Sequence, residues 1–440
     1  MPWVQNYNPL GNAALSTIVA AFPVVALLGL LALGRLQTWI AAVLSLGIAL
    51  SVALFAFEMP APTAFGAALY GGAYGAFPIG WIILNVMFLH ALTVKSGRFE
   101  ALRIQLQQLA PDSRIQLILV AFCFGGFIEG CAGFGAPVAI TAAMLIQLGF
   151  RPLEASALSL IANTAPVAFG SVGIPITTLA QITGLDVLKL SAMVGRQLPF
   201  FSVLIPFWVV WAYDGWKGVR EVWPAALISG AVFAVVQFLV SNYHGPWLVD
   251  TAAGLASIGA LVGLLKLWKP RSSSQSREIE RACSPSSPSH PFRAWSPWLI
   301  LSVFLFIWGL PQIKEWFEGT RSSSQLLSEF RAGASTNSPG FKFSSSFVAP
   351  KFLTPGLHLQ VVRTSPVVPK PPVGQFSPPE KAEFKLNWLS ATGTGIFLSA
   401  LFSGKLMGFR LREMGVLYLQ TILKVRTSLA TIVACWPWAM

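Results

Sequence analysis

The stretch that decides the fold runs from Glu129 to Pro137 and reads EGCAGFGAP. It lies in an apolar segment, Ile115–Phe150, whose only charged residue is Glu129. A segment of this length is typical of a membrane, where a carboxylate is costly and glycine and proline interrupt helical hydrogen bonds. Broken backbone and an ionisable side chain are tolerated there only where protein or a water-filled cavity satisfies them. The stretch therefore predicts a polar site at membrane depth, and transport is the leading hypothesis.

The composition is that of a multi-pass membrane protein. Of the 440 residues, 54% are hydrophobic and 11% are charged, against about a quarter charged in an average soluble domain. The net charge of +13 could suggest a nucleic acid as partner. The basic residues, however, lie between apolar runs and form no amphipathic stripe. We therefore expect a lipid bilayer around the protein and no nucleic-acid partner.

Apolar runs predict an all-α fold, a polytopic bundle of about 11 to 12 membrane segments. The expected spans are Asn12–Leu33, Leu36–Phe57, Pro78–Val94, Ile115–Phe150, Ala155–Leu185, Gln197–Tyr213, Val222–Val240, Trp247–Leu265, Ala294–Leu310, Leu386–Ser403 and Gly415–Met440. Two spans contain runs that helices rarely continue through: Glu129–Pro137 in the first, and Asn163–Pro166 and Gly170–Pro175 in the second. We expect discontinuous or re-entrant helices in both.

Basic residues between the spans predict the orientation. The joints 95–114, 217–220 and 266–293 are rich in Lys and Arg and should face the cytoplasm. Counting spans from these joints places the N-terminus outside and Arg35 inside. The same count places the segment 311–385 outside.

Two segments differ from the rest in composition. Arg271–His290 and Thr320–Pro379 are rich in Ser and Pro, which predicts poorly ordered linkers. The domains that we expect are an N-terminal transport half at 1–269, a basic linker at 270–293, a transmembrane helix at 294–310, a poorly ordered loop at 311–385 and an incomplete C-terminal membrane segment at 386–440.

Four stretches resemble the bacterial L-lactate permease family. They are Trp3–Leu10 (WVQNYNPL), Phe127–Ala139 (FIEGCAGFGAPVA), Ala162–Gly170 (ANTAPVAFG) and Asn387–Thr394 (NWLSATGT). The resemblance implies a multi-pass permease of the bacterial cell inner membrane. It implies proton-coupled uptake of lactate, in its L or D form, or of glycolate, without a cofactor.

The chain also departs from the family that it resembles. Members of that family continue with a second half whose interrupted helices complete the site, whereas this chain ends at Trp436–Met440 within what reads as a helix. Two alternatives therefore stay open. One is an inactive, truncated or frame-disturbed fragment of such a permease, and the other is a carrier of another small organic anion.

Glu129 is the candidate proton carrier. A lactate-like anion must cross the low dielectric with its charge compensated, and one proton carried along makes the movement electroneutral. Burial favours the neutral form of Glu129, which would release its proton when the site rehydrates. Gly130, Gly133 and Gly135 could direct backbone N–H groups at the substrate carboxylate. The alternative is that Glu129 caps a re-entrant turn and never titrates.

Four further residues are candidates. Arg196 could clamp the substrate carboxylate or extend from a helix end to lipid headgroups. Asn163 and Thr164 could donate hydrogen bonds to the hydroxyl and carboxylate of a 2-hydroxy acid, or bond neighbouring helices. His90 could relay a proton or bond another helix. Asp250, close to the start of a span, reads as an interfacial charge.

Catalytic and metal sites are not indicated. The chain lacks the nucleophile elbow of hydrolases, the His-Glu-x-x-His of zinc proteases and a phosphate-binding loop. The four cysteines are widely spread, with no metal-ligand spacing. We therefore expect neither an enzyme nor a metal site.

Overall fold

The chain folds into two compact units. The computed structural model describes residues 2–34, 36–109, 112–131, 133, 135–268, 291–319, 343–365, 368 and 377–436. Unit 1 comprises Met1–Leu84, Gln312–Thr394 and Leu419–Met440, and unit 2 comprises Asn85–Pro311 and Gly395–Tyr418. Of the expected basic linker 270–293, only the last three residues lie within the described part.

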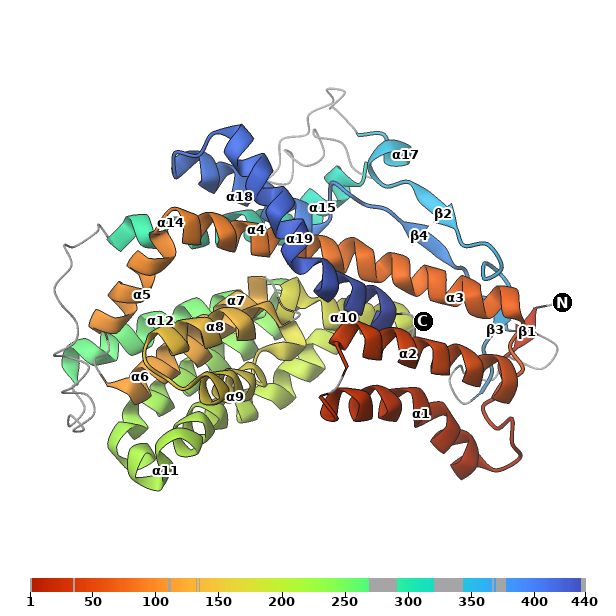
Figure 1. Ribbon diagram of the computed structural model, residues 1–440, viewed down its shortest axis with the longest axis horizontal. Helices are drawn as coiled ribbons and strands as arrows, with labels where there is room; N and C mark the ends of the chain where they lie inside the picture. Colours follow the sequence, from red (N-terminus) through yellow and green to blue (C-terminus); the bar gives the residue numbers. More distant parts are fainter. Residues whose placement is uncertain are drawn as a thin grey trace. The chain divides into compact units, whose positions relative to one another are not determined.

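Helices dominate both units, which confirms the all-α prediction (Figure 1). The described strands form two short pairs in unit 1. β1 (Trp3–Val4) runs parallel to β3 (Val361–Val362), and β2 (Lys351–Leu353) runs antiparallel to β4 (Glu383–Lys385).

Seven described helices are long and apolar enough to cross a membrane, or up to eight if a bent helix pair counts as one span. The sequence predicts about 11 to 12 segments. Part of the difference comes from one helix, α11 (Val187–Tyr243), which contains two of the expected spans. Of two shorter apolar helices, Arg293–Gly309 coincides with the expected span Ala294–Leu310, and Pro137–Gln147 lies within the expected span Ile115–Phe150.

Unit 1 presents much of its apolar surface outward. Phe22, Val25 and Leu28 on its first helix are more than half exposed, as expected of side chains that face lipid. Asn12 caps this helix by accepting hydrogen bonds from the backbone N–H groups of Ala14 and Leu15. The helices that lie wholly or partly in unit 1 are α1 (Ala13–Ala32), α2 (Thr38–Ser51), η1 (Val52–Ala56), α3 (Ala61–Tyr74), η2 (Gly75–Gly80), α4 (Trp81–Lys95), α15 (Pro311–Phe317), α17 (Ser345–Val348), α18 (Thr392–Leu406) and α19 (Leu411–Cys435).

Part of the segment 311–385, where the sequence predicts a poorly ordered loop, forms short ordered elements. These are α15, α17 and the strands β2, β3 and β4. The reason is apolar burial: Leu357, Val361 and Ala382 form a small core against Trp3 and Met59. Residues 320–342 of this segment lie outside the described part.

Unit 2 is built around one buried helical rod. All residues from Asp112 to Cys131 are buried, and the rod packs against α8, α9, α11 and α12. Besides parts of α4, α18 and α19, unit 2 contains α5 (Arg98–Leu109), α6 (Ser113–Leu117), η3 (Ile118–Phe124), α7 (Gly125–Cys131), α8 (Ala136–Gln147), α9 (Pro152–Asn163), η4 (Val167–Phe169), α10 (Gly170–Thr183), α11, η5 (Pro246–Leu248), α12 (Val249–Leu267) and α14 (Pro291–Gly309).

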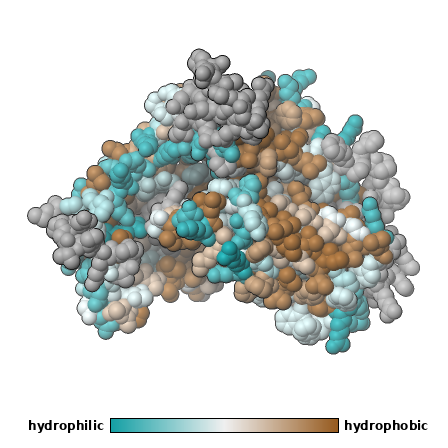
Figure 2. Space-filling view, turned by 180° about the vertical axis from the view of Figure 1, so that it is seen from behind, coloured by the Kyte–Doolittle hydropathy of each residue, from teal (hydrophilic) through white to brown (hydrophobic). Residues whose placement is uncertain are grey.

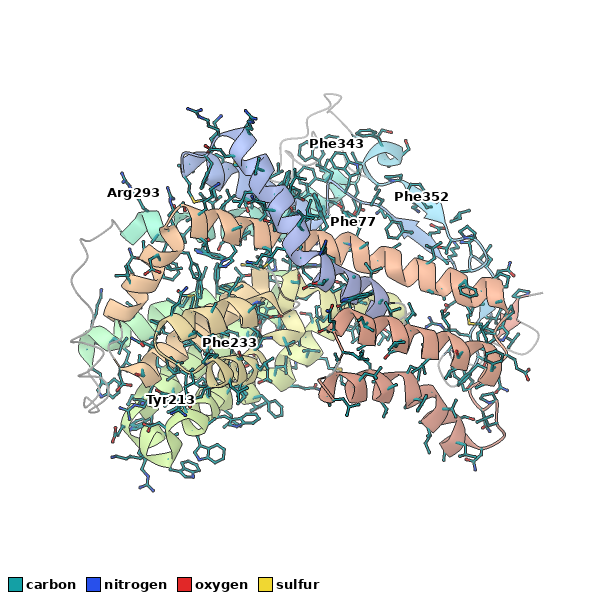
Figure 3. All side chains as sticks on the ribbon, in the orientation of Figure 1. Phe77, Tyr213, Phe233, Arg293, Phe343 and Phe352 are labelled. Atoms are coloured by element: carbon teal, nitrogen blue, oxygen red, sulfur yellow. The ribbon has the colours of Figure 1, made fainter. Side chains whose placement is uncertain are left out.

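Helix α11 is a helical hairpin rather than one straight rod. At Gly215 the backbone turns to φ 64° and ψ −164°, which only glycine adopts readily. The arms on either side pack on each other, with the Ser202 hydroxyl donating to Gln237 Oε1 at 2.6 Å. Near the bend lies Tyr213, which is labelled in Figure 3. Its ring packs against that of Phe150, with 5.0 Å between the ring centroids. The two arms correspond to the separate spans expected at Gln197–Tyr213 and Val222–Val240.

Apolar residues also face outward in unit 2. On α11, Phe200, Phe201 and Leu204 are each at least 60% exposed. Figure 2 shows hydrophobic residues over much of the visible surface. A surface of this kind is stable in lipid and not in water. The protein is therefore a multi-pass membrane protein.

Candidate functional site

Glu129 lies in the last turn of α7, at the end of the buried rod. It is 2% exposed, and the Asn163 side chain at the end of α9 hydrogen-bonds to its carboxylate. Oε2 of Glu129 has no hydrogen-bond partner among the described residues. A buried carboxylate with one unsatisfied oxygen is unusual, because an unpaired buried polar atom is costly. Such an atom calls for a functional explanation.

The Glu129 carboxylate lies directly against the backbone of Gly170. A Cβ placed on Gly170 would be 2.1 Å from Oε1 of Glu129, far closer than atoms can approach. Gly170 joins η4 to α10, so the carboxylate fills the space at a helix interruption. The absence of a side chain at Gly170 therefore makes room for Glu129.

Both expected helix interruptions are present. After α7 the chain turns through Gly133 and Gly135, with φ of 59° and 82°, before α8 begins. The second interruption lies between α9 and α10, which bend by 68°. There, Ser171 and Val172 adopt positive φ. This conformation is strained for residues other than glycine. Strained residues of this kind cluster at functional sites.

The interruptions contact one another. A Cβ on Gly133 would lie 2.8 Å from Cβ of Ser171, so the turn after α7 touches the start of α10. A Cβ on Gly173 would lie 2.7 Å from Cβ of Pro246, the first residue of η5. Interrupted helix ends therefore meet in one place, as they do in carriers whose sites lie at membrane depth.

Gln237 supports the second interruption from α11. Its Nε2 donates to the carbonyl oxygen of Ala165 at 3.3 Å. Ala165 lies between α9 and η4, where a helical partner for its carbonyl is lost. Because freed backbone groups at membrane depth must be satisfied inside the protein, Gln237 stabilises the bent backbone.

Asp250 is a second buried acid at this site. It lies in the first turn of α12 and is 0% exposed. Its carboxylate interacts electrostatically with that of Glu129. The reading of Asp250 as an interfacial charge is therefore wrong, because close packing of α12 on α7 removes it from the surface.

That packing depends on two glycines. A Cβ on Gly130 would lie 2.4 Å from the backbone nitrogen of Thr251, and one on Gly254 would lie 2.5 Å from that of Phe127. Small residues allow membrane helices to approach closely. A sequence signal for Asp250 does exist, because it is the only Asp, Glu, Lys or Arg between Glu221 and Lys266.

Comparison with known proteins identifies the family. The sequence model of the L-lactate permease family matches residues 16–439. The chain is 42% identical to the glycolate permease GlcA of Escherichia coli K12 over 445 residues, covering 98% of this chain and 74% of that protein. The chain belongs to the L-lactate permease family. No solved structure matches it.

Two other proteins similar to this chain are named L-lactate permease. The L-lactate permease of Bacillus subtilis is 39% identical, over 98% of this chain and 75% of that protein. The L-lactate permease of Escherichia coli K12 is 40% identical, over 91% of this chain and 69% of that protein. The chain therefore spans between 69% and 75% of the length of these three relatives.

Of the predicted substrate-site residues, Asn163 bonds to Glu129, and Gly130 follows Glu129 directly in the chain. Gly130 packs on α12, and Gly133 touches Ser171. Gly135 is exposed and is the N-cap of α8. Thr164 is exposed, and its hydroxyl donates to the Ile161 carbonyl oxygen at 2.6 Å, which satisfies the end of α9.

Arg196 and His90 lie elsewhere in unit 2 of the permease. Arg196 is exposed on the first arm of α11, and its Nε donates to Oδ1 of Asn242 on the second arm at 3.0 Å. His90 is half-buried on α4, where its ring packs edge-on against Phe99 at 4.9 Å. The described residues next to the Glu129 carboxylate include Asn163, Gly170 and Asp250.

Proposed function

We propose that this protein is a secondary active transporter of the bacterial inner membrane that takes up lactate or glycolate together with a proton. One observation carries the proposal. In a member of the L-lactate permease family, the single acid of the apolar segment Ile115–Phe150 is buried where interrupted helices meet. We propose no enzymatic activity and no cofactor.

Glu129 carries the proton in this mechanism. In the closed site its burial favours the protonated form, because a charge is poorly solvated there. When the site opens to water, the carboxylate is solvated and the proton leaves. Asn163, hydrogen-bonded to Glu129, links the proton site to the substrate. Lactate and proton then cross together without net charge movement.

The interrupted helices bind the substrate carboxylate. Gly135 is the N-cap of α8, and α10 begins at Gly170, next to Glu129. The first N–H groups of a helix lack internal acceptors and carry partial positive charge, so they favour an anion. The positive φ of Gly133 and Gly135 turns the backbone between α7 and α8. Thr164 and Arg196 stay candidates for the substrate site, and His90 for proton relay.

The proposal is tested by uptake into proteoliposomes that contain the purified protein. An inward proton gradient should drive accumulation of labelled L-lactate, and a protonophore should abolish it. Unlabelled D-lactate and glycolate should compete. If another organic anion were accumulated while these three compounds did not compete, the substrate assignment would be wrong.

Glu129→Gln tests the proton carrier. The variant should abolish uphill accumulation while leaving lactate exchange measurable, because glutamine fixes the site in a neutral form. Exchange of internal for external lactate at equal pH serves as the control for a folded site. Unchanged accumulation would remove Glu129 from the coupling role.

A further inference from the structure

Two buried acids without a compensating cation lie at the site. Glu129 and Asp250 interact electrostatically, and neither forms a salt bridge among the described residues. Both carboxylate oxygens of Asp250 and Oε2 of Glu129 have no hydrogen-bond partner there. Two like charges in a low dielectric cannot both persist in such surroundings.

Asp112 shows how the same unit provides a buried carboxylate with hydrogen-bond partners and a cation. It is 2% exposed, close to the value for Asp250. Its oxygens accept from Arg114 Nε at 3.0 Å and from Arg114 Nη2 at 2.7 Å. Its Oδ1 also accepts from the Arg114 backbone N–H at 2.9 Å. Asp250 has no comparable partner among the described residues.

The elements packed against the start of α12 supply no positive charge to Asp250. α7 contributes Glu129 and the thiol of Cys131. η3 contributes the thiol of Cys123, which bonds to Ser257 further along α12. α10 and η5 contain no ionisable residue. The arms of α11 contribute no charge that interacts with Asp250 among the described residues, and His244, which follows α11, packs against Trp247.

The two acids differ in what stabilises a negative charge. Glu129 receives a hydrogen bond from Asn163, whereas Asp250 receives none from the described residues. The position of Asp250 in the first turn of α12 favours an anion through the helix dipole. That effect is smaller than the cost of burying an uncompensated charge. Glu129 is therefore the acid that ionises, and Asp250 is the one that stays neutral.

We propose that Asp250 keeps its proton throughout the transport cycle and forms with Glu129 a two-acid site in which only Glu129 exchanges a proton. The moving proton rests on the proposed function, whereas the fixed proton of Asp250 does not. With lactate bound, both acids are neutral and the substrate is the only negative charge at the pair. After lactate and the Glu129 proton leave to water, the Glu129 carboxylate is the only negative charge.

The cost of a second negative charge at the site explains why Asp250 is neutral. If Asp250 were ionised, the pair would carry two negative charges whenever Glu129 released its proton. The substrate anion would also approach a negative site. A neutral Asp250 avoids both penalties.

Infrared spectroscopy of the purified protein without lactate tests the proposal. The measured signal is the carbonyl-stretching band of a protonated carboxylic acid at pH about 9, where exposed carboxyl groups are ionised. We expect Glu129→Gln to retain such a band, because Asp250 remains protonated. Asp250→Asn should lose it. Asp112→Asn is the matched control and should leave the band unchanged, because the Asp112 carboxylate is paired with the Arg114 guanidinium.

The infrared spectra of these variants decide whether Asp250 keeps its proton. Absence of a protonated-acid band in Glu129→Gln would overturn the proposal, as would a band that disappears in Asp112→Asn and not in Asp250→Asn. If Asp250→Asn does not fold, Glu129→Gln alone still carries the test. Because no substrate is added, a failure of lactate uptake in proteoliposomes would leave the spectral result unaffected.

Discussion

At the scale of single residues, the site depends on glycines, which have no side chain, as much as on acids. Gly170 leaves the space that the Glu129 carboxylate occupies, and Gly130 allows Thr251 to approach. A methyl group at either position would collide with atoms that cannot move without disturbing the pair of acids. Glycine therefore acts here through close approach, and its conformational freedom matters at Gly133 and Gly135.

Gly170→Ala tests this close approach. The new Cβ would lie 2.1 Å from Oε1 of Glu129 and displace the carboxylate. Overpacking of this kind costs about 1 to 3 kcal/mol, so proton-driven lactate uptake should fall about tenfold. Gly259→Ala on α12, where no atom lies within 4 Å of the added Cβ, is the control. Equal uptake by the two variants would contradict the placement of Glu129.

Arg196→Gln separates the two roles that remain open for Arg196. If the guanidinium binds the substrate carboxylate, lactate affinity should fall while membrane insertion is unchanged. Affinity is measured from the concentration dependence of exchange, and insertion from the amount of protein in washed membranes. The bond from Arg196 to Asn242 joins the two arms of α11. Wild-type affinity would assign the side chain to that bond and to the headgroups.

At the scale of elements, an ion-pair network around the buried Arg114 joins the start of α6 to the bend of α11. Arg114 is 3% exposed and contacts Asp112 at 2.7 Å, Glu221 at 2.6 Å and Asp214 at 3.1 Å. Asp214 and Glu221 flank the bend at Gly215. One guanidinium thus holds together segments that are 100 residues or more apart along the chain.

Arg114→Gln should destabilise unit 2. Removing one partner of a buried pair leaves an uncompensated charge, at a cost of about 3 to 5 kcal/mol, and the partial exposure of Asp214 and Glu221 reduces their share. The thermal unfolding midpoint in detergent should fall. Lys351→Gln, which breaks the exposed Lys351–Glu383 pair, should change stability by less than about 1 kcal/mol. Similar midpoints for both variants would rule out a structural role for the network.

At the scale of the whole molecule, the distribution of basic residues predicts orientation in the membrane. The joints 95–114, 217–220 and 266–293 should face the cytoplasm, and the segment 311–385 should lie outside. Lys217 is exposed in a joint that should face the cytoplasm. Lys351 is exposed in the segment that should lie outside.

Cysteine labelling tests this orientation in cells that express a cysteine-free background. A cysteine at position 351 should react with a membrane-impermeant thiol reagent in intact cells. A cysteine at position 217 should react only after the membrane is permeabilised, because its joint faces the cytoplasm. The reverse pattern would invert the predicted topology, and labelling of both in intact cells would exclude the assignment of 217–220.

Local chemistry allowed much of the site to be predicted. The interruption after α7 follows from the glycines between Glu129 and Pro137, and the bend after α9 follows from Pro166 and the next glycines, because these residues break helices wherever they lie. The burial of Glu129 follows from a long apolar segment with one charge. The role of Gly170 could not be predicted, because its neighbour Glu129 is 41 residues away in the chain.

The sequence by itself determined that this protein is a helical membrane protein, that two spans are interrupted, and that Glu129 is buried beside one interruption. These properties depend on hydropathy and on local backbone preferences, which are carried by neighbouring residues. Only the tertiary structure decided that Asp250 joins Glu129, that Gln237 bonds to the freed carbonyl of Ala165, and that Arg196 bonds to Asn242. The physical reason is that these contacts depend on how distant helices pack, which no local pattern of residues encodes.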